Sequence, residues 1–194
     1  MFNKLKQHII DTPLTILTRE YHAGTDNINV MPFEDVLDEA EISALTKIFQ
    51  MEFKTEVDQY RSECTLNKND DTYRSIETLV PTLEEKFGLE LGDHVDARIW
   101  HDKEGFHFHP HTDNTDIEIS VQIYLDDEAP ECCGTSYFFN GLKKWDNFVN
   151  IWTAPYKTGS GYLLVNTNTE VHGMCHQVPA GCSRTSLYLN FRQK

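Results

Sequence analysis

The strongest constraint on the fold is a change in hydrophobic period near residue 92. Beyond this point, apolar and polar residues alternate in short segments rich in β-branched and aromatic residues, with Gly, Pro, Asn and Asp between them. Alternation with period two is typical of strands, and a series of such strands favours an antiparallel sandwich or jelly roll. We predict strands at 94–100, 117–125, 135–139, 148–153, 162–166 and 183–191.

The first 92 residues show a helical period instead. Two apolar stripes with helical spacing are Ile42, Leu45, Phe49 and Phe53, and Ile76, Leu79, Val80, Leu83 and Phe87. Asp38 and Glu41 fit a capping box before the first stripe. Gly88 suits the end of the second helix, and Pro81 implies a kink or a late start. We predict that these helices support the β-rich half.

The chain length of 194 residues and a hydrophobic content of 39% suit one domain with one sizeable core. We expect a helix-rich support region at 1–92 and a jelly-roll core at 93–194. No apolar run is long enough for a membrane helix or a signal peptide. The five cysteines are odd in number and form no CxxC pair, which indicates reduced thiols. These features predict a soluble, cytoplasmic protein.

The charge of the chain argues against a nucleic-acid partner. Acidic residues outnumber Lys and Arg by 31 to 17, giving a formal net charge of -14. Such a chain repels a phosphate backbone unless a local basic groove overrides the average. A small-molecule or protein substrate is the better expectation.

Residues 107–113 concentrate three imidazoles and one carboxylate in seven positions. If this stretch is extended, His111 and Asp113 lie on the same face and converge on one metal ion. A His-x-Asp pair alone is weak evidence, since about one or two pairs of His with Asp or Glu at this spacing occur by chance in such a composition, and His94 with Asp96 forms another. His107 and His109 are alternative ligands, but only His111 has a carboxylate two residues on.

Downstream residues complete a constellation around the His111 pair. His172 supplies a second imidazole, and two His with one carboxylate are the ligand set that leaves open positions on Fe(II). Twelve residues further on, Arg184 and Ser186 lie on one face of the last predicted strand. A buried guanidinium with a nearby hydroxyl makes a site for a dicarboxylate.

The chain resembles the Fe(II)- and 2-oxoglutarate-dependent dioxygenases, in the branch of the prolyl 4-hydroxylases. The resemblance covers roughly the C-terminal half and depends on six motifs in order: Pro110-His111-Thr112-Asp113, Ile123-Tyr124-Leu125-Asp126, Cys133-Gly134-Thr135-Ser136-Tyr137-Phe138, Gly161-Tyr162-Leu163-Leu164, His172-Gly173 and Arg184-Thr185-Ser186.

This resemblance implies a double-stranded β-helix (jelly roll) and a defined set of site residues. His111, Asp113 and His172 would bind Fe(II) and act as the catalytic residues. Arg184 and Ser186, helped by Tyr124, would bind the distal carboxylate of 2-oxoglutarate. The implied reaction uses O2, hydroxylates a protein side chain or small metabolite, and releases succinate and CO2.

The sequence also departs from the pattern. Many relatives have a Tyr on the strand before the His-x-Asp pair, whereas here Trp100, with Arg98 on the same face, is predicted to face the cofactor or substrate. Cys133-Gly134 replaces the usual Gly-Gly, and residues 143–156 match no motif. A non-catalytic, cupin-like metal-binding jelly roll is the alternative, but it has no need for a buried dicarboxylate site.

Overall fold

The computed structural model describes residues 1–21, 24–52, 54–140, 148–167 and 169–194. Its helices are α1 (Asn3–Asp11), α2 (Glu39–Met51), α3 (Asp71–Glu77), α4 (Val80–Phe87) and the 3-10 turn η1 (Glu131–Cys133). Its strands are β1 (Thr15–Tyr21), β2 (Gly24–Phe33), β3 (Thr55–Glu56), β4 (Arg61–Thr65), β5 (Leu91–Asp102), β6 (Ile117–Tyr124), β7 (Ser136–Asn140), β8 (Phe148–Thr153), β9 (Gly161–Val165), β10 (Val171–Gly173) and β11 (Arg184–Gln193).

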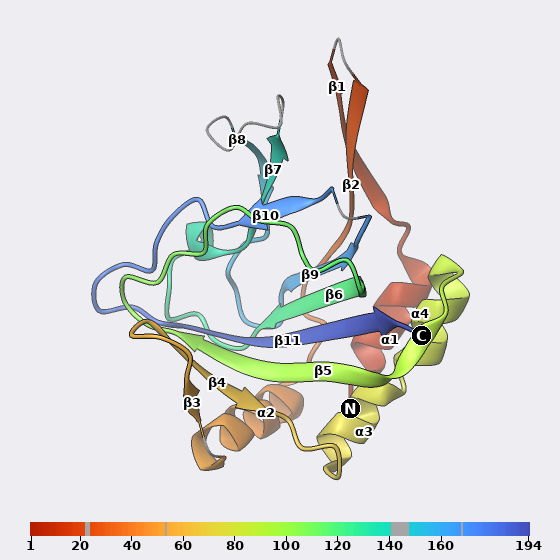
Figure 1. Cartoon of the computed structure of the whole chain (residues 1–194). Helices are drawn as coiled ribbons and strands as arrows, with labels where there is room; N and C mark the ends of the chain where they lie inside the picture. The colour runs from red at the N-terminus through yellow and green to blue at the C-terminus, as the bar shows by residue number, and fades with distance from the viewer. Residues whose placement is uncertain (22–23, 53, 141–147, 168) are drawn as a thin grey trace.

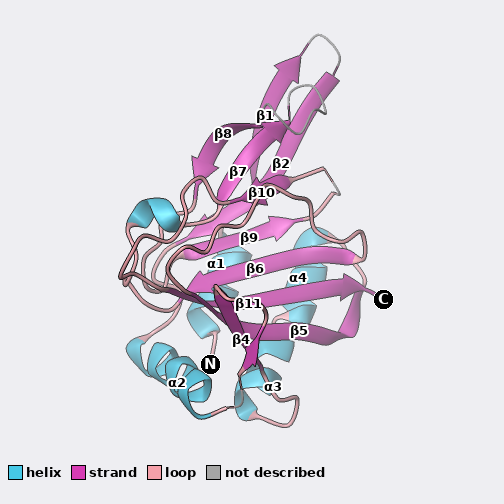
Figure 2. Ribbon diagram, turned by 60° about the vertical axis from the view of Figure 1, so that its left-hand side comes forward, coloured by secondary structure: helices cyan, strands magenta, loops and turns pink. Residues whose placement is uncertain are grey.

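The strands form two antiparallel sheets that face each other. The larger sheet has the order β1-β2-β9-β6-β11-β5-β4-β3, and the smaller one has the order β10-β7-β8. Helices α1 to α4 lie on the outer side of the larger sheet, and the smaller sheet lies on its other side (Figure 1, Figure 2). This arrangement confirms the predicted mainly β, jelly-roll fold with N-terminal helices.

The two faces of the larger sheet have different chemistry because side chains alternate along each strand. On β11, Leu187 and Leu189 belong to the apolar core that packs against the helices. Ser186 and Tyr188 occupy the alternate positions and so face the smaller sheet. The inner face is therefore the polar and aromatic one, where a binding site can form.

Both predicted helical regions are found, with one correction. The capping box of Asp38 and Glu41 is present at the start of α2. The second apolar stripe is shared by two helices, because α3 ends at Glu77 and α4 begins at Val80 with Pro81 in its first turn. The late start implied by Pro81 is confirmed. Gly88 ends α4 in the left-handed conformation, at φ 67°.

All six predicted strands are present, but β1, β2, β3, β4 and β10 were not predicted. Ile28 and Val30 of β2 are buried on one face and Met31 and Phe33 on the other, so this strand lacks simple alternation. Its pairing with β9 places it inside the sheet. The first half thus adds strands as well as helices to the molecule, and the division near residue 92 stays a prediction.

Among the described residues, no helix has both the length and the apolar character needed to cross a lipid bilayer. All five cysteines are free thiols.

Replacement of Gly134 by Ala should destabilise the fold by about 3 kcal/mol or more, because overpacking against rigid atoms costs about this much. A Cβ at this position would lie 1.6 Å from the carbonyl oxygen of Ala154. Gly92→Ala is a suitable control, since its new Cβ would meet nothing nearer than 3.6 Å. Urea unfolding of both variants tests the prediction, and equal stabilities would contradict it.

Candidate metal centre and adjoining cavity

The predicted metal ligands come from two segments that are joined by backbone hydrogen bonds. The amide of His111 donates to the carbonyl of His172 at 2.9 Å, and the amide of His172 donates to that of His111 at the same distance. His172 lies on β10, which pairs with β7. Residues 61 positions apart in the sequence are therefore held side by side by the main chain.

The three side chains present their donor atoms to one another. One ligand atom each of His111, Asp113 and His172 lies within 4.8 Å of the others, the only such cluster of three or more His, Cys, Asp or Glu side chains in the described part of the chain. His172 Nε2 is 3.6 Å from Asp113 Oδ1. Two imidazoles and one carboxylate fit Fe(II), because this donor set leaves half of an octahedral coordination sphere open.

Neighbouring groups orient two of these ligands. His111 Nδ1 is 2.9 Å from the carbonyl oxygen of His109, so this nitrogen carries the proton and Nε2 is left to bind metal. The hydroxyl of Ser120 donates to Asp113 Oδ2 at 2.7 Å, so the other oxygen, Oδ1, is the one that faces His172. This is the kind of support that fixes ligand orientation in metal sites.

Burial keeps His172 in the neutral form that metal binding requires. It lowers the pKa of His172 from 6.5 to about 4, with the nearby Asp113 opposing the shift and His111 adding to it. A neutral imidazole has a lone pair to donate, whereas imidazolium has none. At neutral pH no proton competes with the metal at this position.

The metal-free protein should lose stability as the pH falls from 7 toward 4. An unfolded His172 takes up a proton below pH 6.5, whereas the folded one does so only near pH 4, so the unfolded state is favoured by acid within this window. The free energy of unfolding should be about 2 kcal/mol smaller at pH 5 than at pH 7. Urea titrations in the presence of a chelator measure it, and His172→Asn should lose that part of the pH dependence.

The alternative ligands lie elsewhere. His107 Nε2 is 2.9 Å from the carbonyl of Met174, and His109 is exposed with its ring edge-on to His107. His94 hydrogen-bonds to Tyr73, and Asp96 pairs with Arg98. The second His-x-Asp pair is therefore a chance match.

A small enclosed cavity adjoins the metal centre between the two sheets. It is lined by Arg61, Trp100, Phe108, Gln122, Thr135, Tyr162, His172, Gly173, Met174, Arg184 and Tyr188. Its volume of about 10 Å³ has room for about one water molecule. A five-carbon dicarboxylate therefore enters only if lining side chains move. The predicted metal ligand His172 and the predicted carboxylate-binding Arg184 line the same cavity.

Arg184 is buried and partly paired. Its Nε and Nη2 contact Asp102 Oδ2 at 3.0 and 2.9 Å, and its Nη1 donates to the carbonyl of Cys133 at 2.5 Å. A guanidinium has five N–H groups, so two of them have no partner in these contacts. The side chain is 2% exposed. Arg184 thus retains donors for a carboxylate, but its charge is shared with a buried aspartate that the sequence analysis did not include.

Ser186 and Tyr124 do not line the cavity themselves but contact residues that do. Ser186 Oγ accepts from the Gln122 amide at 2.9 Å, and the Tyr124 hydroxyl accepts from the Thr135 amide at 2.7 Å. Burial raises the pKa of Tyr124, with Arg184 opposing the shift. Gln122 and Thr135 line the cavity themselves, so the predicted helpers contact it through these two residues.

Trp100 and Arg98 share a face, as predicted. Both line an open cleft of about 290 Å³ that also includes His111 and Asp113. Arg98 pairs with Asp96 and Glu63, and the Trp100 indole donates to Glu63 at 3.2 Å. They lie beside the metal ligands at a solvent-accessible opening, and their role toward a substrate stays a prediction.

Three polar residues of this region were not predicted from the sequence: Gln122 and Arg61, which line the cavity, and Asp102, which contacts Arg61 and Arg184. Two of them carried a usable signal. Gln122 is two residues before Tyr124 on a predicted strand. Asp102 continues the alternation of Arg98 and Trp100, but it lies beyond the predicted end of that strand at residue 100. Arg61 carried none, because β4 lies in the half with helical period. The pairing of β4 with β5, which brings Arg61 to the cavity, becomes visible only in three dimensions.

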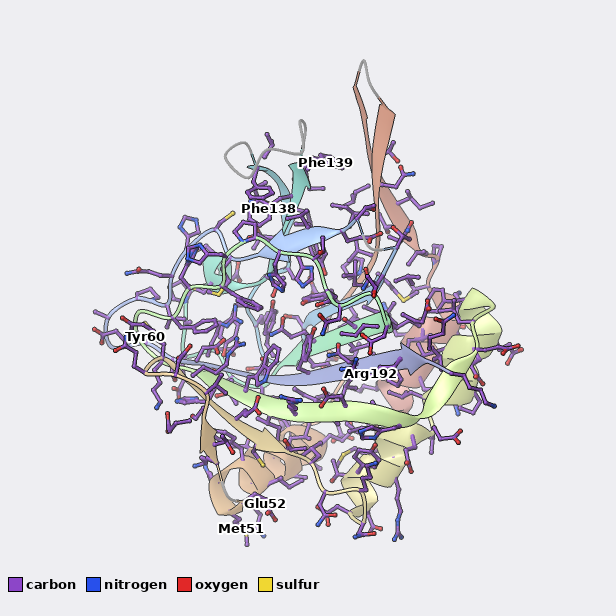
Figure 3. The ribbon with its side chains drawn as sticks, viewed as in Figure 1. Met51, Glu52, Tyr60, Phe138, Phe139 and Arg192 are labelled. Atoms are coloured by element: carbon purple, nitrogen blue, oxygen red, sulfur yellow. The ribbon has the colours of Figure 1, made fainter. Side chains whose placement is uncertain are left out.

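Part of the unassigned stretch 143–156 can now be placed. Trp152 on β8 packs against Tyr137, with ring centroids 5.5 Å apart. Tyr156 is buried, and its hydroxyl accepts from the Thr185 amide at 2.9 Å. Trp145 lies outside the described residues. Figure 3 labels Phe138 and Phe139 on β7, the strand that pairs with both β8 and β10.

Comparison with solved structures shows which fold this is. The chain aligns with the non-heme α-ketoglutarate-dependent epimerase SnoN from nogalamycin biosynthesis at a TM-score of 0.65 and 13% identity, over 84% of this chain and 77% of that one. HygX from Streptomyces hygroscopicus, with nickel and 2-oxoglutarate bound, gives 0.64 and 9%, over 85% and 83%. A Pseudomonas putida prolyl-4-hydroxylase gives 0.61 and 16%, over 85% and 92%.

These similarities confirm the predicted fold resemblance to the Fe(II)- and 2-oxoglutarate-dependent oxygenases, prolyl 4-hydroxylases included. No family model and no curated protein sequence matches this chain. At these identities the likeness concerns the fold, and chemistry has to be argued from the site.

Proposed function

We propose that this protein is an Fe(II)- and 2-oxoglutarate-dependent oxygenase that hydroxylates a protein side chain or a small metabolite. The observation that carries this proposal is the position of the cluster of His111, Asp113 and His172 beside a cavity lined by Arg184. A ferrous ion there would supply the activation of O2 that is coupled to decarboxylation of 2-oxoglutarate to succinate and CO2.

The residues of this chain have separate tasks in such a reaction. His111, Asp113 and His172 hold the metal and leave adjacent positions for co-substrates. The unpaired N–H groups of Arg184 bind the distal carboxylate of 2-oxoglutarate. Gln122, which is hydrogen-bonded to Ser186, Thr135 and Tyr162, forms part of the buried cavity wall that would exclude water.

The substrate is expected to approach through the cleft beside Trp100 and Arg98. This cleft includes His111 and Asp113 and opens to solvent, so a C–H bond placed there lies beside the metal ligands. Both a protein side chain and a metabolite suit an open cleft of this size. The similar structures include both an epimerase and a prolyl hydroxylase, so the fold leaves this choice open.

The proposal is tested by succinate formation. Anaerobically purified protein is incubated with Fe(II), 2-oxoglutarate and air, with His111→Ala and Arg184→Ala as controls. Wild-type protein should form succinate even without a substrate, at a low uncoupled rate, and both variants should not. A wild-type rate equal to both variants, with no 2-oxoglutarate binding by calorimetry, would contradict the proposal. Metal binding without 2-oxoglutarate binding would favour the cupin-like alternative.

A further inference from the structure

Arg61 places a second buried guanidinium in the cavity. It is the first residue of β4, directly after the β3–β4 turn where Tyr60 lies (Figure 3). Its guanidinium carbon is 4.1 Å from the ring centroids of both Trp100 and Phe106. The side chain is 7% exposed. Arg61 is therefore held in place by aromatic contacts and lines the same cavity as His172 and Arg184.

One nitrogen of Arg61 is without a partner. Its Nε donates to Asp102 Oδ1 at 2.5 Å, whereas its Nη2 is buried and has no hydrogen-bond partner among the described residues. Buried donors on charged groups are normally satisfied, and an orphan calls for a ligand or another acceptor. Because Arg61 lines the cavity, an acceptor bound there can supply the missing contact.

The strand register brings two guanidiniums to one carboxylate. Asp102 on β5 is the direct neighbour of Arg61 on β4 and of Arg184 on β11. Arg61 contacts its Oδ1 and Arg184 its Oδ2. Two arginines and one aspartate have a net charge of +1. Each of the three side chains is at most 7% exposed, so this charge is shielded from water. One further carboxylate would neutralise it.

We propose that Arg61 binds a carboxylate in this cavity together with Arg184, and that this carboxylate is the distal one of 2-oxoglutarate. The inference depends on the proposed function, which supplies the co-substrate. Arg61 and Arg184 contact opposite oxygens of the same aspartate, so the unpartnered Nη2 of Arg61 and the two remaining N–H groups of Arg184 are available to one binding site. The distal carboxylate balances the local charge, while the metal and Asp113 are balanced by the carboxylate beside the keto group.

Binding calorimetry on the Mn(II)-loaded protein tests the assignment with two ligands. 2-Oxoglutarate has the distal carboxylate, and 2-oxopentanoate has the same chain length without it. Arg61→Met should bind 2-oxoglutarate about 10- to 100-fold more weakly, which corresponds to one charge-assisted hydrogen bond. Its affinity for 2-oxopentanoate should change by less than about twofold, because that ligand offers the guanidinium no carboxylate.

Two further variants keep the test decisive. Arg74→Met removes a largely exposed guanidinium from α3, which does not line the cavity, and should leave the affinity for both ligands unchanged. Arg61→Lys keeps the charge but has no second nitrogen, so it should also bind 2-oxoglutarate more weakly, by about 10-fold. If Arg61→Met does not fold, as judged by circular dichroism, Arg61→Lys decides the question by the same ligand comparison.

The outcomes separate this inference from the proposed function. Wild-type protein that binds no 2-oxoglutarate would refute the proposed function. Wild-type protein that binds it while Arg61→Met and Arg61→Lys bind it equally well would refute the role of Arg61 alone. Equal losses for both ligands would mean a structural role. An unchanged 2-oxoglutarate affinity with a raised KM for a carboxylate-bearing substrate would assign the partner carboxylate to that substrate and overturn the inference.

Discussion

Replacement of His172 by Ala should weaken Fe(II) binding by more than about 100-fold, since loss of a group that merely supports a ligand already costs about 10- to 100-fold. Succinate formation should disappear with it. The imidazole of His172 is buried, neutral and 3.6 Å from Asp113, and the only cluster of three potential ligands among the described residues contains it. Anaerobic titration with Fe(II) in competition with a chelator of known affinity measures the loss.

His109→Ala is the matched control for this experiment. His109 lies two residues before His111 and is exposed, and its backbone carbonyl, which the substitution retains, is the part that contacts His111. Metal affinity should stay within about twofold of wild type, as expected for a side chain that coordinates nothing. Comparable losses in both variants would mean that the metal is held elsewhere in the histidine-rich stretch.

Replacement of Asp102 by Asn should reduce the free energy of unfolding by about 3–5 kcal/mol, the usual cost of removing one partner from a buried ion pair. The carboxylate is fully buried and faces two guanidiniums, which would both lose their counter-ion. Urea unfolding followed by circular dichroism measures the change.

Asp96→Asn provides the comparison for Asp102→Asn. Asp96 lies on the same strand and pairs with Arg98 and Arg192, whose side chains are 36% and 33% exposed. Because solvent screens this group, the variant should lose no more than about 1 kcal/mol. Similar losses in both variants would show that the burial of Asp102 and its two arginines does not increase their contribution to the free energy of unfolding.

The sequence was most informative where the signal is local. Alternation within each segment predicts its strand, and the spacing of His111 and Asp113 predicts that they share a ligand site, because both features depend on neighbours in the chain. The distant His172 could be added only because the order of motifs resembles a known family. The backbone bridge that joins it to His111 depends on how the segment of His111 meets β10 in three dimensions.

The features that were missed depend on tertiary pairing. β2 is buried on both faces and β3 has only two residues, so neither has a clear period. Arg61 looks like any polar residue until β4 pairs with β5 and places it opposite Asp102. The partial pairing of Arg184 with this aspartate was hidden for the same reason.

The row formed by Arg61, Asp102 and Arg184 also bears on how the sheet selects its alignment during folding. A slip of β4 by one residue would turn the side chain of Arg61 to the opposite face, against the apolar layer under the helices. Asp102 would then lose one cation, and a charge would be buried among hydrocarbon. Misaligned sheets are thereby penalised electrostatically, so the same three residues that shape the cavity help to make one strand alignment unique.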